Sequence, residues 1–87
     1  MMRIGYDPLF LKQVQRLPIA QQRKLSGLII LLQNNPHDPR LHTKKLGPPL
    51  EGHLSFRITR DWRVVFRFLS PEDIFITRVK HRKDIYR

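Results

Sequence analysis

Hydrophobic and polar residues alternate along residues 54–68, and this pattern predicts two half-buried strands joined by a break at Arg60-Asp61. The positions expected to face a core are Leu54, Phe56, Ile58, Trp62, Val64, Phe66 and Phe68. The opposite face would carry Ser55, Arg57, Thr59, Arg63, Val65 and Arg67. We therefore expect an antiparallel hairpin with a core on one face, Trp62 included, and a row of arginines on the other. Guanidinium planes of this kind suit phosphate.

A helical pattern precedes this hairpin. Asp7-Pro8 is typical of a helix start, with Asp7 as the N-cap and Pro8 at the first helical position. Phe10, Val14 and Leu17 follow at the i, i+4, i+7 spacing of an amphipathic helix. The residue before a proline avoids helical dihedral angles, so Leu17-Pro18 should interrupt the helix.

A second helix is predicted from near Pro18 to about Asn34. The residues that keep its helical spacing are Leu25, Leu28, Ile29 and Leu32. Ile30 and Leu31 widen the apolar face, so we expect this helix to be covered on more than one side. Gly27 costs about 1 kcal/mol relative to alanine in a helix, and its missing side chain would permit close packing.

The remaining segments complete an α+β domain that spans residues 1–87. Residues 2–6 are expected to form an edge strand, and residues 37–52 a long loop whose basic segment Lys44-Lys45 is anchored by Leu46. A turn at residues 70–73 leads to a third strand of the meander at residues 74–80. The predicted order is β-α-α-β-β-β, with a helical hairpin packed on a small, twisted, mainly antiparallel sheet.

Charge is the strongest feature of the composition. Seventeen Lys and Arg residues against seven Asp and Glu residues give a net charge of +10, which favours a polyanionic partner such as nucleic acid or an acidic protein. The chain has no cysteine, so disulfides and thiolate zinc sites are excluded. Its longest apolar run, residues 28–32, is too short for a membrane span, and no secretory signal is visible. We therefore expect a cytoplasmic protein with no membrane partner.

Few catalytic motifs fit the sequence. His37, His42, His53 and His81 have no metal-ligand spacing and no acidic cluster beside them, so we expect neither a metal nor another cofactor. What remains is a cluster of cations with an aromatic residue near the end of the chain. Its members are Lys44, Lys45, Arg57, Arg63, Arg67, Lys80, Arg82 and Tyr86. Outward positions on adjacent antiparallel strands lie about 5 Å apart, so like charges there destabilise the sheet unless an anion joins them.

The motifs that carry a family resemblance cover nearly the whole chain. They are Lys45-Leu46-Gly47, Phe56-Arg57-Ile58, the run Asp61-Trp62-Arg63-Val64-Val65-Phe66, and the run from Val79 to Tyr86. Together they resemble the RelE/ParE superfamily of type II toxin–antitoxin toxins, most closely its RelE-like branch. The resemblance implies a RelE-like microbial ribonuclease-type fold.

It also implies a ribosome-dependent mRNA endonuclease, or mRNA interferase. Such an enzyme inhibits translation by metal-independent cleavage, in which the 2′-hydroxyl attacks the phosphodiester. The matching catalytic positions are Arg57, Arg63, Arg82 and Tyr86, and those implied in RNA or ribosome binding are Lys44, Lys45, Arg60, Arg67 and Lys83. Some relatives carry a lysine pair where Ser55 and Arg57 stand, which leaves the general base open among His81, His53, Lys80 and Tyr86.

The implied partners are the ribosome, its mRNA, and a cognate antitoxin whose acidic, partly disordered segment wraps the toxin in a hetero-oligomer. Two other readings stay open. A ParE-like toxin would inhibit DNA gyrase by binding, without catalysis. A basic RNA-binding or structural module would have no toxic effect.

Overall fold

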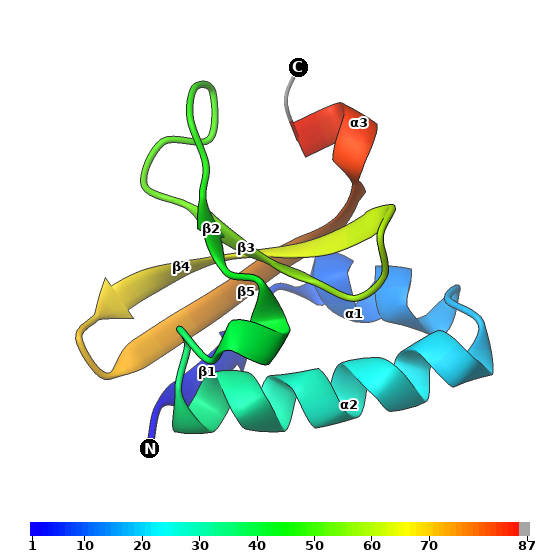
Figure 1. Ribbon diagram of the computed structural model, residues 1–87, viewed down its shortest axis with the longest axis horizontal. Coiled ribbons are helices and arrows are strands. Elements are labelled where there is room, and N and C mark those ends of the chain that lie inside the picture. Colours follow the sequence, from blue (N-terminus) through cyan, green and yellow to red (C-terminus); the bar gives the residue numbers. More distant parts are fainter. Residues whose placement is uncertain (86–87) are drawn as a thin grey trace.

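A five-stranded sheet with two helices on one face forms the body of the protein (Figure 1). The computed structural model describes residues 1–85. The elements are β1 (Arg3–Tyr6), α1 (Pro8–Gln15), α2 (Ile19–Asn34), the 3-10 turn η1 (Pro39–Leu41), β2 (Lys44–Lys45), β3 (Leu54–Arg57), β4 (Trp62–Ser70), β5 (Asp73–His81) and α3 (Arg82–Ile85). The sheet order is β1-β5-β4-β3-β2, and β1 pairs with β5 in parallel while the other pairs are antiparallel. The predicted α+β class and mainly antiparallel sheet are confirmed.

The helix boundaries follow from local chemistry. Asp7 caps α1 by accepting a hydrogen bond from the Leu9 N–H at 2.8 Å, and Pro8 occupies the first helical position. Helix α1 ends before Pro18, and α2 starts directly after that residue. Both predicted helices are therefore confirmed.

The main core lies between the helices and the sheet face that they cover. Helical residues such as Phe10, Leu25 and Leu32 are buried against strand residues such as Phe56 and Phe66. The alternation in β3 and β4 produces this arrangement, since every second residue points toward the helices. We call the opposite face of the sheet the outer face.

The outer face has a small apolar cluster of its own. Val65 of β4 is buried there beneath Leu46, Ile85 and the partly buried Leu50. These contacts hold the loop after β2 and helix α3 over the outer face, where Figure 1 shows them on the side opposite α1 and α2. The sequence predicted the anchoring role of Leu46, whereas α3 and its contact through Ile85 were not predicted.

The structure corrects several expectations about packing and one about secondary structure. Trp62 is 36% exposed instead of buried, because it begins β4 at the end of the sheet, where its ring forms a T-shaped contact with the His81 ring. Ile30 is 59% exposed, because α2 contacts the sheet through one face only. A Cβ at Gly27 would find no atom within 4 Å, so no neighbouring element packs closely against this glycine. The predicted loop at residues 37–52 contains η1 and β2.

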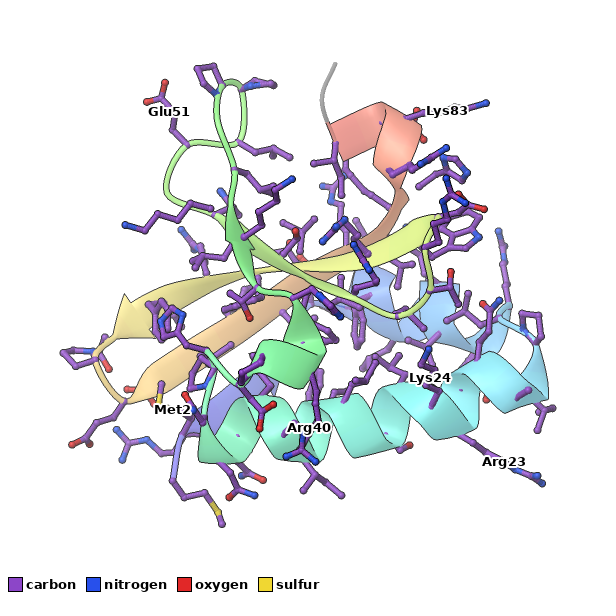
Figure 2. All side chains as sticks on the ribbon, viewed as in Figure 1. Met2, Arg23, Lys24, Arg40, Glu51 and Lys83 are labelled. Atoms are coloured by element: carbon purple, nitrogen blue, oxygen red, sulfur yellow. The ribbon has the colours of Figure 1, made fainter. Side chains whose placement is uncertain are left out.

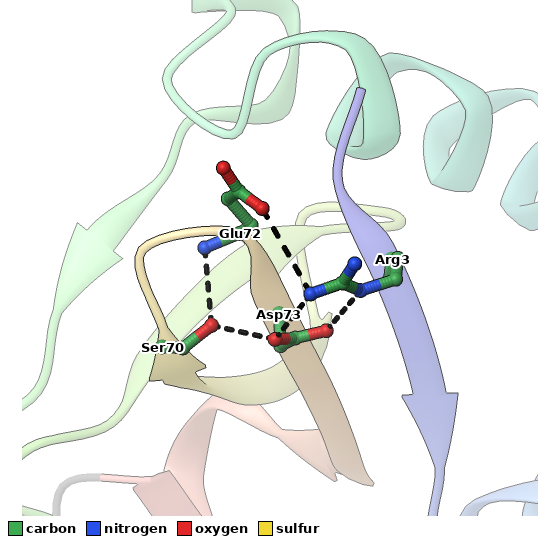
Figure 3. Close-up of polar contacts among 4 residues, drawn as sticks. All are labelled: Arg3, Ser70, Glu72 and Asp73. Atoms are coloured by element: carbon green, nitrogen blue, oxygen red, sulfur yellow. Dashed lines mark hydrogen bonds and ion pairs between the residues drawn. The ribbon is translucent and has the colours of Figure 1, made fainter.

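An ion pair ties the N-terminal strand to the β4–β5 turn (Figure 3). The Arg3 Nε donates to Asp73 Oδ1 at 2.7 Å, and Ser70 Oγ donates to Asp73 Oδ2 at 2.6 Å. These hydrogen bonds lower the pKa of Asp73 to about 2, and the bond from Arg3 has the larger effect. Across residues 1–85, no helix is both long and apolar enough to cross a membrane.

Candidate functional site

Three cations lie side by side on the outer face. Arg57 of β3 pairs with Arg63 of β4, and Arg63 pairs in turn with Lys80 of β5. Directly opposed residues on neighbouring strands share a face, so the three side chains form one row across the sheet. We call Arg57, Arg63 and Lys80 the basic row.

The basic row is partly buried, and two of its buried nitrogen atoms lack hydrogen-bond partners within the described residues. Arg63 is only 6% exposed. Within residues 1–85, no hydrogen bond reaches the buried Arg57 Nε, the buried Arg63 Nη1 or the buried hydroxyl of Ser55. Ser55 lies two residues before Arg57 on the same strand face. A buried donor without an acceptor is destabilising, so this arrangement is suited to an anion that accepts from the row.

Three aspartates pair with cations outside the basic row. Asp73 binds Arg3, Asp38 binds Arg40, and Asp61 binds Arg82. For the basic row, the described chain offers no carboxylate within ion-pair distance. Among the described residues, no ion pair therefore neutralises the charge of the basic row.

A cavity of about 420 Å³ adjoins the row at Lys80. It is lined by Asp7, Leu50, His53, Val65, Arg67, Phe75, Thr77, Arg78 and Lys80. Arg67 and His53, two of the predicted site residues, thus lie beside the basic row. The cavity combines cations, one carboxylate and an aromatic ring, which is a lining suited to a polar, planar ligand.

The other predicted RNA-binding residues are spread over the outer face and its rim. Lys44 pairs with Ser55 and so shares the outer face, whereas the neighbouring Lys45 falls on the alternate side of β2. Arg60 is exposed at the β3–β4 turn. Lys83 is exposed on α3 and points away from the sheet (Figure 2).

Arg82 lies at the end of the sheet that holds the basic row. Its Nε is 3.3 Å from Asp61 Oδ1, and its backbone N–H donates to the Asp61 carbonyl at 2.8 Å. These contacts join the start of α3 to the β3–β4 turn. The predicted catalytic residue Tyr86 lies outside the described residues.

The titratable candidates fall on different faces. Lys80 belongs to the row and His53 lines the adjoining cavity. His81 pairs with Trp62, and the centroids of the two rings are 5.1 Å apart. Its Nδ1 also accepts the Lys83 N–H at 3.2 Å, so its ring serves the start of α3. Lys80 and His53 are therefore better placed than His81 to exchange a proton with a ligand on the row.

Arg78 and Phe75 are site residues that the sequence pattern missed. Simple alternation from Ile74 and Ile76 would turn Arg78 toward the helices. The ladder instead passes from Val65–Arg78 to Phe66–Ile76, which leaves Thr77 as an extra residue on β5. This bulge puts Arg78 on the outer face and Val79 in the core. A charged residue at a core position followed by an apolar one was the available signal.

Among the residues that the structure describes, no group of three or more His, Cys, Asp or Glu side chains could hold an ion. The outer face offers fixed positive charge, hydrogen-bond donors and the side chains of Lys80 and His53.

Solved structures of bacterial and archaeal toxins share this fold. The YoeB/ParE toxin from Agrobacterium tumefaciens superimposes with a TM-score of 0.79 at 20% identity, over 93% of this chain and 99% of that one. The archaeal RelE–RelB complex from Pyrococcus horikoshii gives 0.77 at 23% identity, over 93% and 94%. YafQ from E. coli gives 0.74 at 23% identity, over the full length of both chains. These three solved structures therefore have the same fold as this chain.

The match of the sequence to a family of known proteins identifies the family of this chain. Residues 4–86 match the family described as ParE toxin of the type II toxin-antitoxin system, parDE. The chain therefore belongs to this family and is a type II toxin of the RelE/ParE superfamily, as the sequence resemblance predicted. A comparison with curated proteins found no match.

Proposed function

We propose that this toxin is a metal-independent, ribosome-dependent mRNA endonuclease. The observation that carries the proposal is the basic row, in which the buried Arg63 and its neighbours Arg57 and Lys80 lack a carboxylate within the described chain. A phosphodiester supplies the charge and the acceptor oxygens that these cations need, and guanidinium groups bind phosphate in a bidentate geometry.

The proposed reaction needs charge stabilisation and two proton transfers. The 2′-oxygen attacks the phosphorus and loses its proton, the bond to the 5′-oxygen breaks, and that oxygen gains a proton. The products are a 2′,3′-cyclic phosphate and a 5′-hydroxyl end. Arg57 and Arg63 stabilise the charge that develops on the phosphate. Arginine is a poor base, so the protons are assigned to Lys80, His53 or Tyr86.

The first test is a reconstituted translation assay with purified protein, followed by primer extension on the mRNA. We expect discrete cuts that require ribosomes. Arg63→Gln should reduce cleavage by about 100-fold to 1,000-fold, because it removes a charged donor from the phosphate. Arg23→Gln is the matched control, since Arg23 points away from the sheet on α2 (Figure 2). Intact mRNA with undiminished protein synthesis would overturn the proposal.

A second candidate is inhibition of DNA gyrase by binding. The family description, which names ParE toxins, favours it, and the basic outer face would then dock a partner without chemistry. A supercoiling assay separates the two candidates. Loss of gyrase activity while translation continues would assign the protein to the gyrase class, and the reverse result would support the endonuclease.

We further propose that a cognate antitoxin neutralises this toxin. Solved relatives include the YoeB–YefM complex from Staphylococcus aureus and the RelE–RelB complex from Pyrococcus horikoshii. The net charge of +10 favours an acidic segment. The α1–α2 turn and Trp62 line a second groove of about 460 Å³, and exposed apolar residues such as Leu9, Leu11 and Ile19 lie on the same helices. Co-purification with the product of an adjacent gene tests this proposal, and a toxin that stays unbound would contradict it.

A further inference from the structure

We propose that the cavity beside the basic row is a nucleobase subsite, which binds the base next to the phosphate held by Arg57, Arg63 and Lys80. Phe75 would supply the stacking surface, and Arg67 and Arg78 would contact the backbone. The inference rests on the proposed RNA cleavage and adds residues that the sequence did not identify as part of the site.

The first argument is position. Lys80 belongs to both the row and the cavity wall, so the cavity begins where the row ends. Arg78 pairs with Val65, and Phe75 pairs with Arg67, farther along the same two strands. Residues two apart on a strand are separated by about 6.6 Å. The outer-face cations therefore extend away from the row along β4 and β5, as in grooves that follow a single-stranded backbone.

The second argument is the Phe75 ring. It is only partly buried, and it lines the cavity. The ring is supported by Gly5 of the neighbouring strand β1, where a Cβ would lie 3.3 Å from the Phe75 Cδ1 atom. Because Gly5 has no side chain, the ring rests close to the β1 backbone and keeps the rest of its surface for the cavity. Bases stack on such rings in sequence-tolerant single-strand sites.

The third argument is Asp7, the carboxylate in the lining. Its Oδ1 caps α1, so the side chain is fixed at the cavity. A negative charge there disfavours a second phosphate, but it can accept hydrogen bonds from the amino group of a base. The cations of the cavity lining thus suit the phosphate backbone of RNA, and the interior of the cavity suits a base. A volume of about 420 Å³ falls within the range of small-ligand sites.

The test is an NMR titration of the ¹⁵N-labelled protein with a 2′-O-methyl trinucleotide, which has no free 2′-hydroxyl and cannot be cleaved. We expect amide shifts at Arg67, Phe75 and Arg78 in addition to those at the row. Phe75→Leu should weaken binding roughly tenfold, because an aliphatic side chain does not stack on a base. The matched control is Phe68→Leu, since Phe68 is a partly exposed aromatic residue that pairs with the core residue Ile74 on the helix side.

The outcomes separate the subsite from the proposed function. Wild-type binding with shifts confined to the row, and equal affinity in Phe75→Leu, would overturn the subsite and leave the endonuclease proposal standing. Wild-type protein that neither binds the trinucleotide nor cuts mRNA on ribosomes would overturn both. If Phe75→Leu melts at a lower temperature, Arg78→Gln replaces it. That variant should lose several-fold in affinity while its melting temperature stays within a few degrees of wild type.

Discussion

Arg63 on β4 lies directly opposite Arg57 on β3, and Arg63 is 94% buried even though the described chain provides no carboxylate for it. Like charges in register destabilise a sheet, and a buried guanidinium without an anion adds to the cost. The phosphate ligand that we propose would complete this arrangement. Sites selected for function often reduce stability in this way.

Replacing Arg63 with a methionine should make the toxin more stable and inactive. Methionine keeps much of the volume of the buried side chain and removes the charge, so we expect unfolding free energy to rise by about 1–2 kcal/mol. Urea unfolding monitored by circular dichroism measures the change. Arg23→Met, at an exposed position on α2, should alter stability by less than about 0.5 kcal/mol. A lower stability of the Arg63 variant would show that the guanidinium is already well paired in the free protein.

Binding to RNA should depend on salt in proportion to the cations that contact phosphate. Lys80, on β5, lies at one end of the basic row, and Lys80→Gln should remove one such phosphate contact. We expect the slope of log Kd against log salt concentration to decrease by about 0.7 for a single-stranded oligonucleotide. Fluorescence anisotropy between 50 and 300 mM salt, roughly the range in which this effect is large, measures it. An unchanged slope would place Lys80 away from the RNA backbone.

Local patterns in the sequence predicted the elements that depend on neighbouring residues. The Asp7 cap, the break at Pro18 and the alternation of β3 and β4 were all readable, because each follows from residues a few positions apart. The bulge at Thr77 was not readable, because it arises from pairing between β4 and β5. The burial of Val65 under Ile85 joins residues twenty positions apart. The place of Arg78 in the cavity wall depends on the bulge, and so this residue was missed as well.

The Arg3–Asp73 ion pair should make the toxin sensitive to acid. The pKa of Asp73 is lowered to about 2 in the folded protein, chiefly by the Arg3 hydrogen bond, whereas a free aspartate titrates near 4. A lowered pKa stabilises the fold above that usual value, and the contribution is lost as the pH falls from about 4 to 2. Asp73→Asn should therefore flatten the decrease in the urea midpoint over this range. The pKa of Asp38 is also lowered to about 2, so part of the decrease in the urea midpoint should remain in the variant.

Gly27→Ala should stabilise the toxin without affecting its activity. Gly27 lies inside α2, is exposed, and has nothing within 4 Å of the position that a Cβ would take. Alanine is favoured over glycine in a helix by about 1 kcal/mol, because it restricts the unfolded backbone. Differential scanning calorimetry should show a melting temperature about 4–8 °C higher. A lower melting temperature would mean that a partner or a neighbouring residue requires a position without a side chain at Gly27.

Ile85→Ala should detach α3 from the outer face. Ile85 is buried against Val65 and Leu46, and α3 is only four residues long, so this contact is its main apolar anchor. Losing the buried side chain costs about 2 kcal/mol, and amide exchange in α3 should accelerate roughly 30-fold while the β4 amides change less. Cleavage should decrease too, because Arg82 would no longer be held beside Asp61. Ile85→Val, which keeps most of the contact, should retain slow exchange in α3. Full activity with fast α3 exchange would exclude α3 from the catalytic site and leave the basic row to act alone.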